Sequence, residues 1–358
     1  MRSGLKGLGA VYAAVMTART ILYEQGWFSS WRPPAPCISV GNISWGGSGK
    51  TPLCEWLLTW CWQQGLTPAL LTRGYKARPP FLPYRVSQDS PVQQAGDEPL
   101  MLARSCPSTA HIVVDPKRKR GGQWIAGRAN PGVYVLDDGF QHVGVQRDID
   151  LVLLRPADLG RDWAAVIPGG PWREGPRALG RAHAFLVNVH PDNVSELLPE
   201  IRARLIPLGK PIFCFSPHIQ ESIRVIDRTP VPHVSAGECL LVSGVGSPES
   251  VEASVRAFLG GPVKEHLRFP DHRSYTSKDW ELIADRATSL GCSSILCTSK
   301  DAVKLEKFAD PRLTCLKAGL SFGHSWPQSP DFTSWLASSL RGIQMTSRAK
   351  KGKASAKH

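Results

Sequence analysis

A glycine-rich segment near the start of the chain carries the residue types that bind nucleotide phosphates. It runs from Ser44 to Thr51 and follows an apolar run that ends at Val40. Backbone N–H groups of such a turn point at phosphate oxygens, and the helix that begins there adds a favourable dipole. In the pattern G-x-x-x-x-G-K-[ST], the lysine reaches the β- and γ-phosphates and the hydroxyl binds Mg²⁺. We predict a phosphate site formed by Ser44, Gly46, Gly47, Ser48, Gly49, Lys50 and Thr51.

The chain differs from this P-loop pattern at one position and lacks a guanine-reading motif. Ser44 stands where the pattern has glycine, and Gly46 and Gly47 are expected to relieve the backbone instead. Guanine-specific proteins carry N/T-K-x-D, whereas here Asp301 directly follows Lys300. The sequence therefore favours ATP over GTP, and it assigns no chemistry to the Lys300-Asp301 pair.

Two carboxylates follow a second apolar run, Val133–Leu136. An aspartate at the end of a strand beside a phosphate loop holds Mg²⁺ directly or through water. Strands that end in aspartate are common, so this interpretation depends on the phosphate loop upstream. We predict Asp138 as the first choice for the metal and Asp137 as the second, and which of them contacts the ion directly is left open.

Short apolar runs alternate with longer helix-like segments through most of the chain, which is typical of a parallel sheet covered by helices. The predicted strands of a first series are Cys37–Val40, Ala69–Thr72, His111–Val114, Val133–Leu136, Ile149–Leu154 and Ala184–Val189. A second series has predicted strands at Leu240–Ser243, Val263–Phe269, Ser294–Thr298 and Leu313–Lys317, and predicted helices at Glu249–Leu259 and Ser277–Leu290. Between the two series, Pro211–Arg228 is interpreted as a pair of extended linker strands.

The predicted fold class is α/β: a P-loop NTPase-type parallel sheet with helices on both faces, plus a second, smaller α/β domain joined by extended linker strands. The predicted boundaries are 1–30 for an N-terminal helix, 31–210 for the P-loop domain, 211–236 for the linker, 237–340 for the second domain and 341–358 for a basic tail that we expect to be disordered.

The composition bounds the class of protein. The chain has 358 residues, a 42% hydrophobic fraction and a net charge of +13, which exclude a disordered or collagen-like protein. Its nine cysteines form no CxxC pair, which favours reduced thiols over a disulfide framework or a zinc site. No stretch reaches the ~20 apolar residues that a transmembrane helix needs.

Both ends of the chain have features of a membrane-surface protein. Leu5, Leu8, Tyr12 and Val15 share one helical face near a basic start, which fits an amphipathic helix lying in a membrane interface, or a first helix packed on its own domain. A signal peptide is disfavoured by the phosphate site that follows at once. The tail 341–358 has six basic residues and no acid, which fits an anionic surface or a solubilising tail.

Eight strings along the chain occur together in a known order. They are GNISWGGSGKTP, LTRGYK (71–76), GDEPLMLAR (96–104), VLDDGFQH (135–142), IPGGPWREGP (167–176), SGVGSPES (243–250), FPDHRSYTSKD (269–279) and TSKDAVKL (298–305). This constellation resembles the tetraacyldisaccharide 4′-kinase family, the lipid A 4′-kinases, from about residue 36 to about residue 320. Serine or threonine is typical of that family at position 44.

The resemblance implies transfer of the ATP γ-phosphoryl group to the 4′-hydroxyl of tetraacyldisaccharide 1-phosphate, which gives lipid IV-A. It also implies a peripheral enzyme on the cytoplasmic face of the inner membrane, with an anionic membrane surface and the lipid substrate as partners. No nucleic acid and no obligate protein partner are expected. The cofactors implied are ATP and Mg²⁺.

The resemblance also assigns roles to individual residues. Asp97 corresponds to the catalytic base, although from sequence alone an acid before Pro99 more often caps a helix. His272 is its expected partner, with Arg273 standing where many relatives have a second histidine, and Lys50 acts on the transferred phosphate. Glu98 is expected near the metal. Predicted substrate-binding residues are Arg73, Tyr75, Arg118, Gln141, His142 and Glu174, and which arginine of 118–120 takes the family position is left open.

Two other classes of function compete with the kinase. A membrane-associated P-loop ATPase switch shares the glycine-rich loop but would hydrolyse ATP without a lipid acceptor. The GDEP turn and a second domain that carries His272 favour the kinase. Nucleic-acid binding through the basic tail has little support, because no accompanying motif is present.

Overall fold

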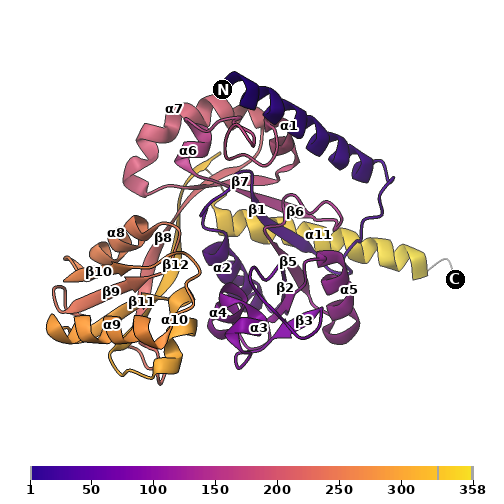
Figure 1. The fold of residues 1–358 in the computed structure, drawn as a ribbon. Helices are drawn as coiled ribbons and strands as arrows, with labels where there is room; N and C mark the ends of the chain where they lie inside the picture. Colours follow the sequence, from indigo (N-terminus) through magenta and orange to yellow (C-terminus); the bar gives the residue numbers. More distant parts are fainter. Residues whose placement is uncertain (1, 329, 356–358) are drawn as a thin grey trace.

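A single twelve-stranded sheet runs through the part of the chain that the computed structural model describes, residues 2–328 and 330–355. Its strand order is β10-β9-β11-β12-β8-β7-β6-β1-β5-β2-β4-β3 (Figure 1). The strands are β1 (Cys37–Asn42), β2 (Pro68–Thr72), β3 (Tyr84–Val86), β4 (His111–Val114), β5 (Val133–Asp137), β6 (Ile149–Leu154), β7 (Ala184–Asn188), β8 (Ile212–Arg224), β9 (Cys239–Ser243), β10 (Glu265–Arg268), β11 (Ser294–Thr298) and β12 (Leu313–Trp326). The α/β class predicted from the alternating apolar runs is therefore confirmed.

The first lobe, which comprises β1–β7 with their helices, places the phosphate loop in the middle of the sheet. Strand β1 pairs in parallel with β5 on one side and with β6 on the other, and Val40 lies opposite Asp137. The helices of this lobe are α2 (Lys50–Gln63), α3 (Val92–Ala95), α4 (Asp97–Ser105), α5 (Arg118–Ala129), α6 (Pro156–Leu159) and α7 (Val194–Arg204), with 3₁₀ turns η1 (Pro176–Arg181), η2 (Pro191–Asn193) and η3 (Ile206–Leu208). Because carboxyl ends of parallel strands share one edge, the loop after β1 and the acids after β5 face one crevice.

The two faces of this lobe have separate apolar cores. Leu53 and Leu57 of α2, Leu100 of α4 and Leu336 of the C-terminal helix pack on one face. On the other face, α5 packs beside Trp31, and α7 packs through Ile201 against β6 and β7. Helices therefore cover both faces, as predicted.

The C-terminal helix corrects one expectation. Helix α11 runs from Phe332 to Ser355, so the segment from 341 that we expected to be disordered continues a helix. Its first turns are anchored by Phe332, Leu336 and Leu340, which are buried. Seven of the fifteen residues 341–355 are alanine, lysine or arginine, which favour helix once a packed stretch has nucleated it.

The linker also differs from its predicted form. The segment 211–236 holds one long strand, β8, and its partner is not a neighbour in sequence but β12, in antiparallel register from Thr314↔Arg224 to Trp326↔Ile212. The same β8 pairs in parallel with β7, so the ribbon ties both lobes into one sheet. The register of β12 shifts between Lys317 and Ala318 and between Phe322 and Ser325, and such irregularities bend a strand locally.

The second lobe comprises β9–β11 with α8 (Pro248–Leu259), α9 (Ser277–Ser289), α10 (Ser299–Leu305) and η4 (Glu306–Phe308). Ile283 and Ala287 of α9 pack on one face of its strands, and Val255 of α8 packs on the other. The predicted strands and helices of this second series are present, although β12 is longer than expected.

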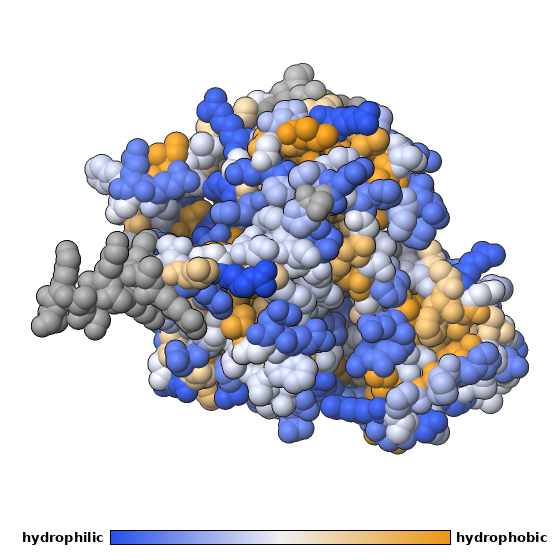
Figure 2. Space-filling view, turned by 180° about the vertical axis from the view of Figure 1, so that it is seen from behind, coloured by the Kyte–Doolittle hydropathy of each residue, from blue (hydrophilic) through white to orange (hydrophobic). Residues whose placement is uncertain are grey.

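Helix α1 (Arg2–Glu24) packs on the first lobe through one stripe and exposes apolar residues on another. Gly9 and Thr20 are buried, and Tyr12 and Ala13 contact the core beneath α7. The large apolar residues of α1 that remain exposed are Leu5, Leu8, Val11, Val15 and Ile21. On the face drawn in Figure 2, apolar patches lie at the top of the molecule, where Figure 1 places α1 and α7. No helix in the described residues is long and apolar enough to cross a bilayer.

Candidate active site

The phosphate loop is held open by glycines and by side chains from neighbouring strands. Gly46 and Gly49 have φ of 111° and 90°, values that side chains with a Cβ rarely adopt. The Asn42 amide donates to Ser48 Oγ over 3.1 Å, and Arg155 donates to Ser44 Oγ over 3.2 Å. Gly49 precedes α2, and no side chain among the described residues caps that helix. The first N–H groups of α2 are therefore available to an anion.

Lys50 and Asp138 meet across this crevice. Lys50 Nζ lies 3.4 Å from Asp138 Oδ1, and Arg173 Nη1 lies 2.8 Å from Asp138 Oδ2. Burial opposes ionisation of Asp138, but Lys50 and Arg173 outweigh it and hold its pKa below the ordinary value. Its φ of 51° turns the carboxylate out of the strand direction toward the loop. An ionised acid beside the loop lysine suits a metal–phosphate centre.

Asp137 is instead held by the neighbouring strand β2. Its Oδ2 accepts a hydrogen bond of 2.7 Å from the Thr72 hydroxyl. Burial, together with the nearby charge of Glu98, raises its pKa. Of the two acids, Asp138 is the one already paired with the cations of the crevice.

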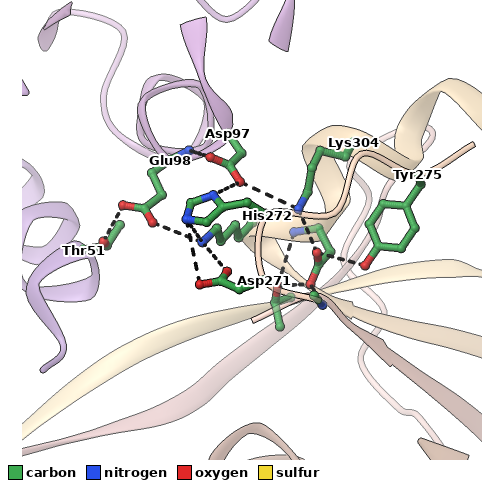
Figure 3. A network of polar contacts seen from close by, with 11 residues as sticks. Thr51, Asp97, Glu98, Asp271, His272, Tyr275 and Lys304 are labelled. Atoms are coloured by element: carbon green, nitrogen blue, oxygen red, sulfur yellow. Dashed lines mark hydrogen bonds and ion pairs between the residues drawn. The ribbon is translucent and has the colours of Figure 1, made fainter. Parts of the chain in front are cut away.

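Asp97 and His272 come from different lobes and form a direct contact (Figure 3). Asp97 is the first residue of α4. The N-cap position is held by Gly96, whose φ is 83° and which has no side chain to cap the helix. Asp97 Oδ1 accepts the Glu98 N–H, and Asp97 Oδ2 lies 2.9 Å from His272 Nδ1. The capping alternative is therefore not what the structure shows, because the carboxylate is directed to the imidazole.

Glu98 connects the phosphate loop to the second lobe. Its Oε2 accepts from the Thr51 hydroxyl over 3.1 Å, and its Oε1 lies 3.2 Å from Lys300 Nζ. Lys300 also pairs with Asp271 over 3.0 Å. Burial disfavours the charged lysine, but Glu98 and Asp271 outweigh this and raise its pKa.

Helix α10 supplies both lysines of this cluster. Asp301 is fully buried, and its carboxylate accepts from the Gly244 N–H over 3.0 Å and from the Tyr275 hydroxyl over 3.0 Å. Lys304, one turn after Lys300, lies 3.0 Å from Asp301 and 3.7 Å from Asp97. The buried Asp301 therefore fixes α10 so that Lys300 and Lys304 both reach the Asp97–His272 pair.

The residues at the crevice fit Mg²⁺ in the manner usual for phosphoryl-transfer sites. Among the described residues, no group of three or more His, Cys, Asp or Glu side chains forms a ready metal cage. Mg²⁺ in such sites uses one or two carboxylates and completes its shell with waters and substrate phosphates. Asp138, Glu98 and the Thr51 hydroxyl are oxygen donors of this kind around the loop.

Five of the predicted substrate residues lie around the same crevice. Gln141 donates to the Asn42 carbonyl and contacts Arg173 over 3.4 Å, and the Tyr75 ring lies 4.9 Å from the His272 ring. Burial and the nearby Arg118 charge lower the pKa of His142 to about 4. Arg73 is exposed, and its charge acts on both Arg118 and His142.

The geometry distinguishes Arg118 from its basic neighbours. Arg118 is 3% exposed, contacts the Asp137 carbonyl over 3.4 Å, and its Nε has no hydrogen-bond partner among the described residues. Arg120 is instead held bidentately by Asp115. Lys119 reaches Ser29. Arg118 is therefore the member of the run that faces the crevice.

Glu174 was wrongly expected to touch substrate. It is 2% exposed, and both of its carboxylate oxygens accept from Arg181 at 2.9 Å. This buried pair fixes the segment around Trp172 instead. Sequence reasoning missed the adjacent Arg173 in the same PWREGP string, and it missed Lys300 and Lys304 in the TSKDAVK string, where two basic residues one helical turn apart were the available signal.

Comparisons with known proteins agree over nearly the whole chain. The family model of tetraacyldisaccharide-1-P 4′-kinases matches residues 1–341. The tetraacyldisaccharide 4′-kinase of Oleidesulfovibrio alaskensis is 46% identical over 328 residues (91% of this chain, 90% of that protein), and that of Nitratidesulfovibrio vulgaris is 44% identical over 326 residues (91% and 90%). The crystal structure of LpxK from Aquifex aeolicus in complex with ATP superimposes with a TM-score of 0.70 at 28% identity, covering 90% of this chain and 95% of that one.

Proposed function

The chain belongs to the tetraacyldisaccharide-1-P 4′-kinase family, and from this premise we propose that it transfers the γ-phosphoryl group of ATP to the 4′-hydroxyl of tetraacyldisaccharide 1-phosphate, which forms lipid IV-A. The observation that carries the proposal is the Asp97–His272 contact between lobes, close to the phosphate loop. A P-loop switch that only hydrolyses ATP has no need of a carboxylate held by an imidazole from a second lobe.

The chain's own residues account for the proton and the developing charge. Asp97 accepts the proton of the 4′-hydroxyl as that oxygen bonds to the γ-phosphorus, while the bond from phosphorus to the β–γ bridging oxygen breaks. The N–H groups of the loop and the Lys50 ammonium hold the phosphate oxygens in line. His272 holds the Asp97 carboxylate in place, and closure of the second lobe over the crevice excludes water.

We assign Mg²⁺ to Thr51, Glu98 and Asp138, with Asp137 behind them. When bound, the ion neutralises charge on the β- and γ-phosphates. An apolar cavity of about 290 Å³ adjoins Thr51 and Glu98 and is lined by Val251, Val255 and Leu316 among others. We assign this cavity to the adenine base.

The lipid end of the substrate is assigned to helix α1. A groove of about 520 Å³ is lined by Val15, Ala18, Arg19, Leu22, Tyr23 and Phe28. Arg19 donates to the Gln141 carbonyl over 3.2 Å, so this groove lies next to the loop that carries Gln141 and His142. Acyl chains along α1 would therefore place the sugar at the crevice. We propose a peripheral enzyme on the cytoplasmic face of the inner membrane, where anionic lipids attract a basic protein.

Transfer of ³²P from γ-labelled ATP to tetraacyldisaccharide 1-phosphate in detergent tests the proposed function. Labelled lipid that appears only with enzyme and acceptor supports the kinase. Free phosphate released at the same rate with and without the lipid would instead establish the ATPase switch.

Arg118→Met is expected to raise KM for the lipid acceptor about tenfold or more, because a guanidinium that pairs bidentately with an anion is lost. The assay is acceptor-dependent transfer at saturating ATP. KM for ATP, measured at saturating lipid, is expected to change by less than about threefold, because the contacts of the phosphate loop are retained. Arg128→Met is the matched control, since Arg128 lies on the same helix and is exposed. An unchanged lipid KM in a folded Arg118→Met enzyme contradicts the assignment.

Replacing Leu8, Val11 and Val15 together by serine is expected to lower recovery of the protein on anionic vesicles severalfold. These residues are 59–63% exposed, and each loses apolar area that a membrane interface would bury. Sedimentation with vesicles measures the effect. The control changes Ala10 and Ala14 of the same helix, which are also exposed but do not line the groove, to serine. Equal recovery of both variants would remove α1 from the membrane contact.

A further inference from the structure

We propose that Lys300 is a positioning residue that fixes the tautomer of His272, so that the imidazole carries its proton on Nδ1 and donates it to Asp97. The inference rests on the proposed kinase function, in which Asp97 must remain an ionised acceptor. It concerns a residue to which the sequence pattern assigned no chemistry.

The two ring nitrogens of His272 face partners of opposite kinds. Nδ1 lies 2.9 Å from Asp97 Oδ2, and Nε2 lies 3.2 Å from Lys300 Nζ. An ammonium group has donors only, so the Nε2 atom that it contacts must present a lone pair. The single ring proton then belongs on Nδ1, where the carboxylate accepts it.

A competing acceptor makes the lysine decisive. Asp271 Oδ2 lies 3.9 Å from His272 Nε2 and is the other charged group on that side of the ring. Without Lys300, a carboxylate would face each ring nitrogen, so Nε2 would take up a proton as well and the ring would become a doubly protonated imidazolium. Lys300 contacts both Asp271 Oδ1, over 3.0 Å, and Nε2, over 3.2 Å, so its charge offsets that of the acid beside the ring nitrogen.

The surroundings hold both the lysine and the ring in place. Lys300 also pairs with Glu98 over 3.2 Å, and its side chain is 14% exposed. His272 has φ of 59°, a strained value that persists only where neighbours fix the residue. The Tyr75 ring packs against the imidazole with a centroid separation of 4.9 Å. Lys304 lies 3.7 Å from Asp97 (Figure 3). A flipped ring would lose the Asp97 contact.

The consequence for catalysis is the destination of the substrate proton. With Nε2 blocked by an ammonium group and Nδ1 already protonated, His272 does not take up the proton of the hydroxyl. Asp97 Oδ1 and Oδ2 each accept one N–H and retain further lone pairs, so the proton passes to the carboxylate.

The test is the ¹⁵N chemical shifts of His272 in the full chain, read from two-bond ¹H–¹⁵N correlation spectra at one fixed pH. The chain has ten histidines, and the His272→Asn variant identifies the resonances of this one. We expect the Nδ1–H pattern in the native chain and in Lys300→Arg, whose guanidinium also has donors only. Lys300→Met is expected to shift His272 toward the doubly protonated pattern, in which Nε2 carries a proton as well, and Lys278→Met, which removes an exposed lysine of α9, is the control.

Kinetics separate positioning from binding. Lys300→Met is expected to lower kcat about tenfold or more, within the ~10²–10⁴-fold that a positioned base contributes, with KM for ATP and lipid nearly unchanged. A native Nε2–H pattern, or an Nδ1–H pattern that survives in Lys300→Met, would overturn the proposal. So would full rescue of Lys300→Met by added Mg²⁺, which would assign Lys300 to the metal site. The spectra need no substrate, so failure of lipid phosphorylation would refute the proposed function without affecting this result.

Discussion

Replacing Asp97 by asparagine is expected to lower kcat for lipid phosphorylation by about 10²–10⁴-fold, because the amide cannot accept the hydroxyl proton. The amide keeps the size of the carboxylate and can still face His272, so the contact between lobes is expected to persist. Binding of a non-hydrolysable ATP analogue, measured by calorimetry, should stay within about threefold of the native value. The loss therefore belongs to the chemical step.

The matched control is Asp89→Asn, which removes an exposed acid of the same lobe and should leave kcat unchanged. If Asp97→Asn weakened ATP binding as strongly as it lowered kcat, Asp97 would be a residue of the nucleotide site. Acceptor-independent ATP hydrolysis that survives in Asp97→Asn while lipid transfer disappears would support the base assignment further, since water does not depend on that carboxylate in the same way.

The strands and the phosphate loop could be predicted from the sequence, because both depend on local patterns. Buried parallel strands are short and continuously apolar, so runs such as Val133–Leu136 stand out. The phosphate loop is equally local, since Gly46 to Thr51 are contiguous. A parallel sheet then brings Asp138 to Lys50 as a geometric consequence, and the structure shows that pair at 3.4 Å.

Features that depend on distant partners could not be predicted in this way. β8 alternates as an extended segment, but its partner lies about a hundred residues later in β12, and no turn between them indicates the pairing. Helix α11 is basic throughout its last turns, and composition alone does not distinguish a solvated helix from a disordered tail. Its anchoring residues, such as Leu336, lie before the segment in question.

The site shows the same division between residue type and pairing. Asp97 and His272 were each predicted from their strings, yet Lys300 came from a string that offered no role. A glutamate such as Glu174 is suited to bind a sugar hydroxyl, but both of its carboxylate oxygens accept hydrogen bonds from the Arg181 side chain in the interior of the protein. Such ion pairs are set by tertiary packing, so a motif can supply the right residue types and still leave their partners undetermined.

Lys50→Met is expected to lower kcat/KM for ATP by about 10²–10³-fold or more, since a positive charge aimed at the transferred phosphate is lost. Unlike Asp97→Asn, this variant should also bind the ATP analogue more weakly, because the ammonium contacts the phosphates in the ground state as well. Asp138 keeps Arg173 at 2.8 Å as its partner, so the carboxylate is not left unpaired and the fold should persist. Thermal unfolding checks that point.

Two further variants decide what the Lys50 result means. Lys50→Arg keeps the charge but has a broader, planar head group, so it should recover part of the ATP affinity and little of kcat if a compact charge at the γ-phosphate is required. Lys278→Met, which removes an exposed charge from α9, controls for the general loss of basicity. If Lys50→Met retained native transfer rates in a folded protein, the glycine-rich loop would be a structural turn, and the phosphate site would have to lie elsewhere.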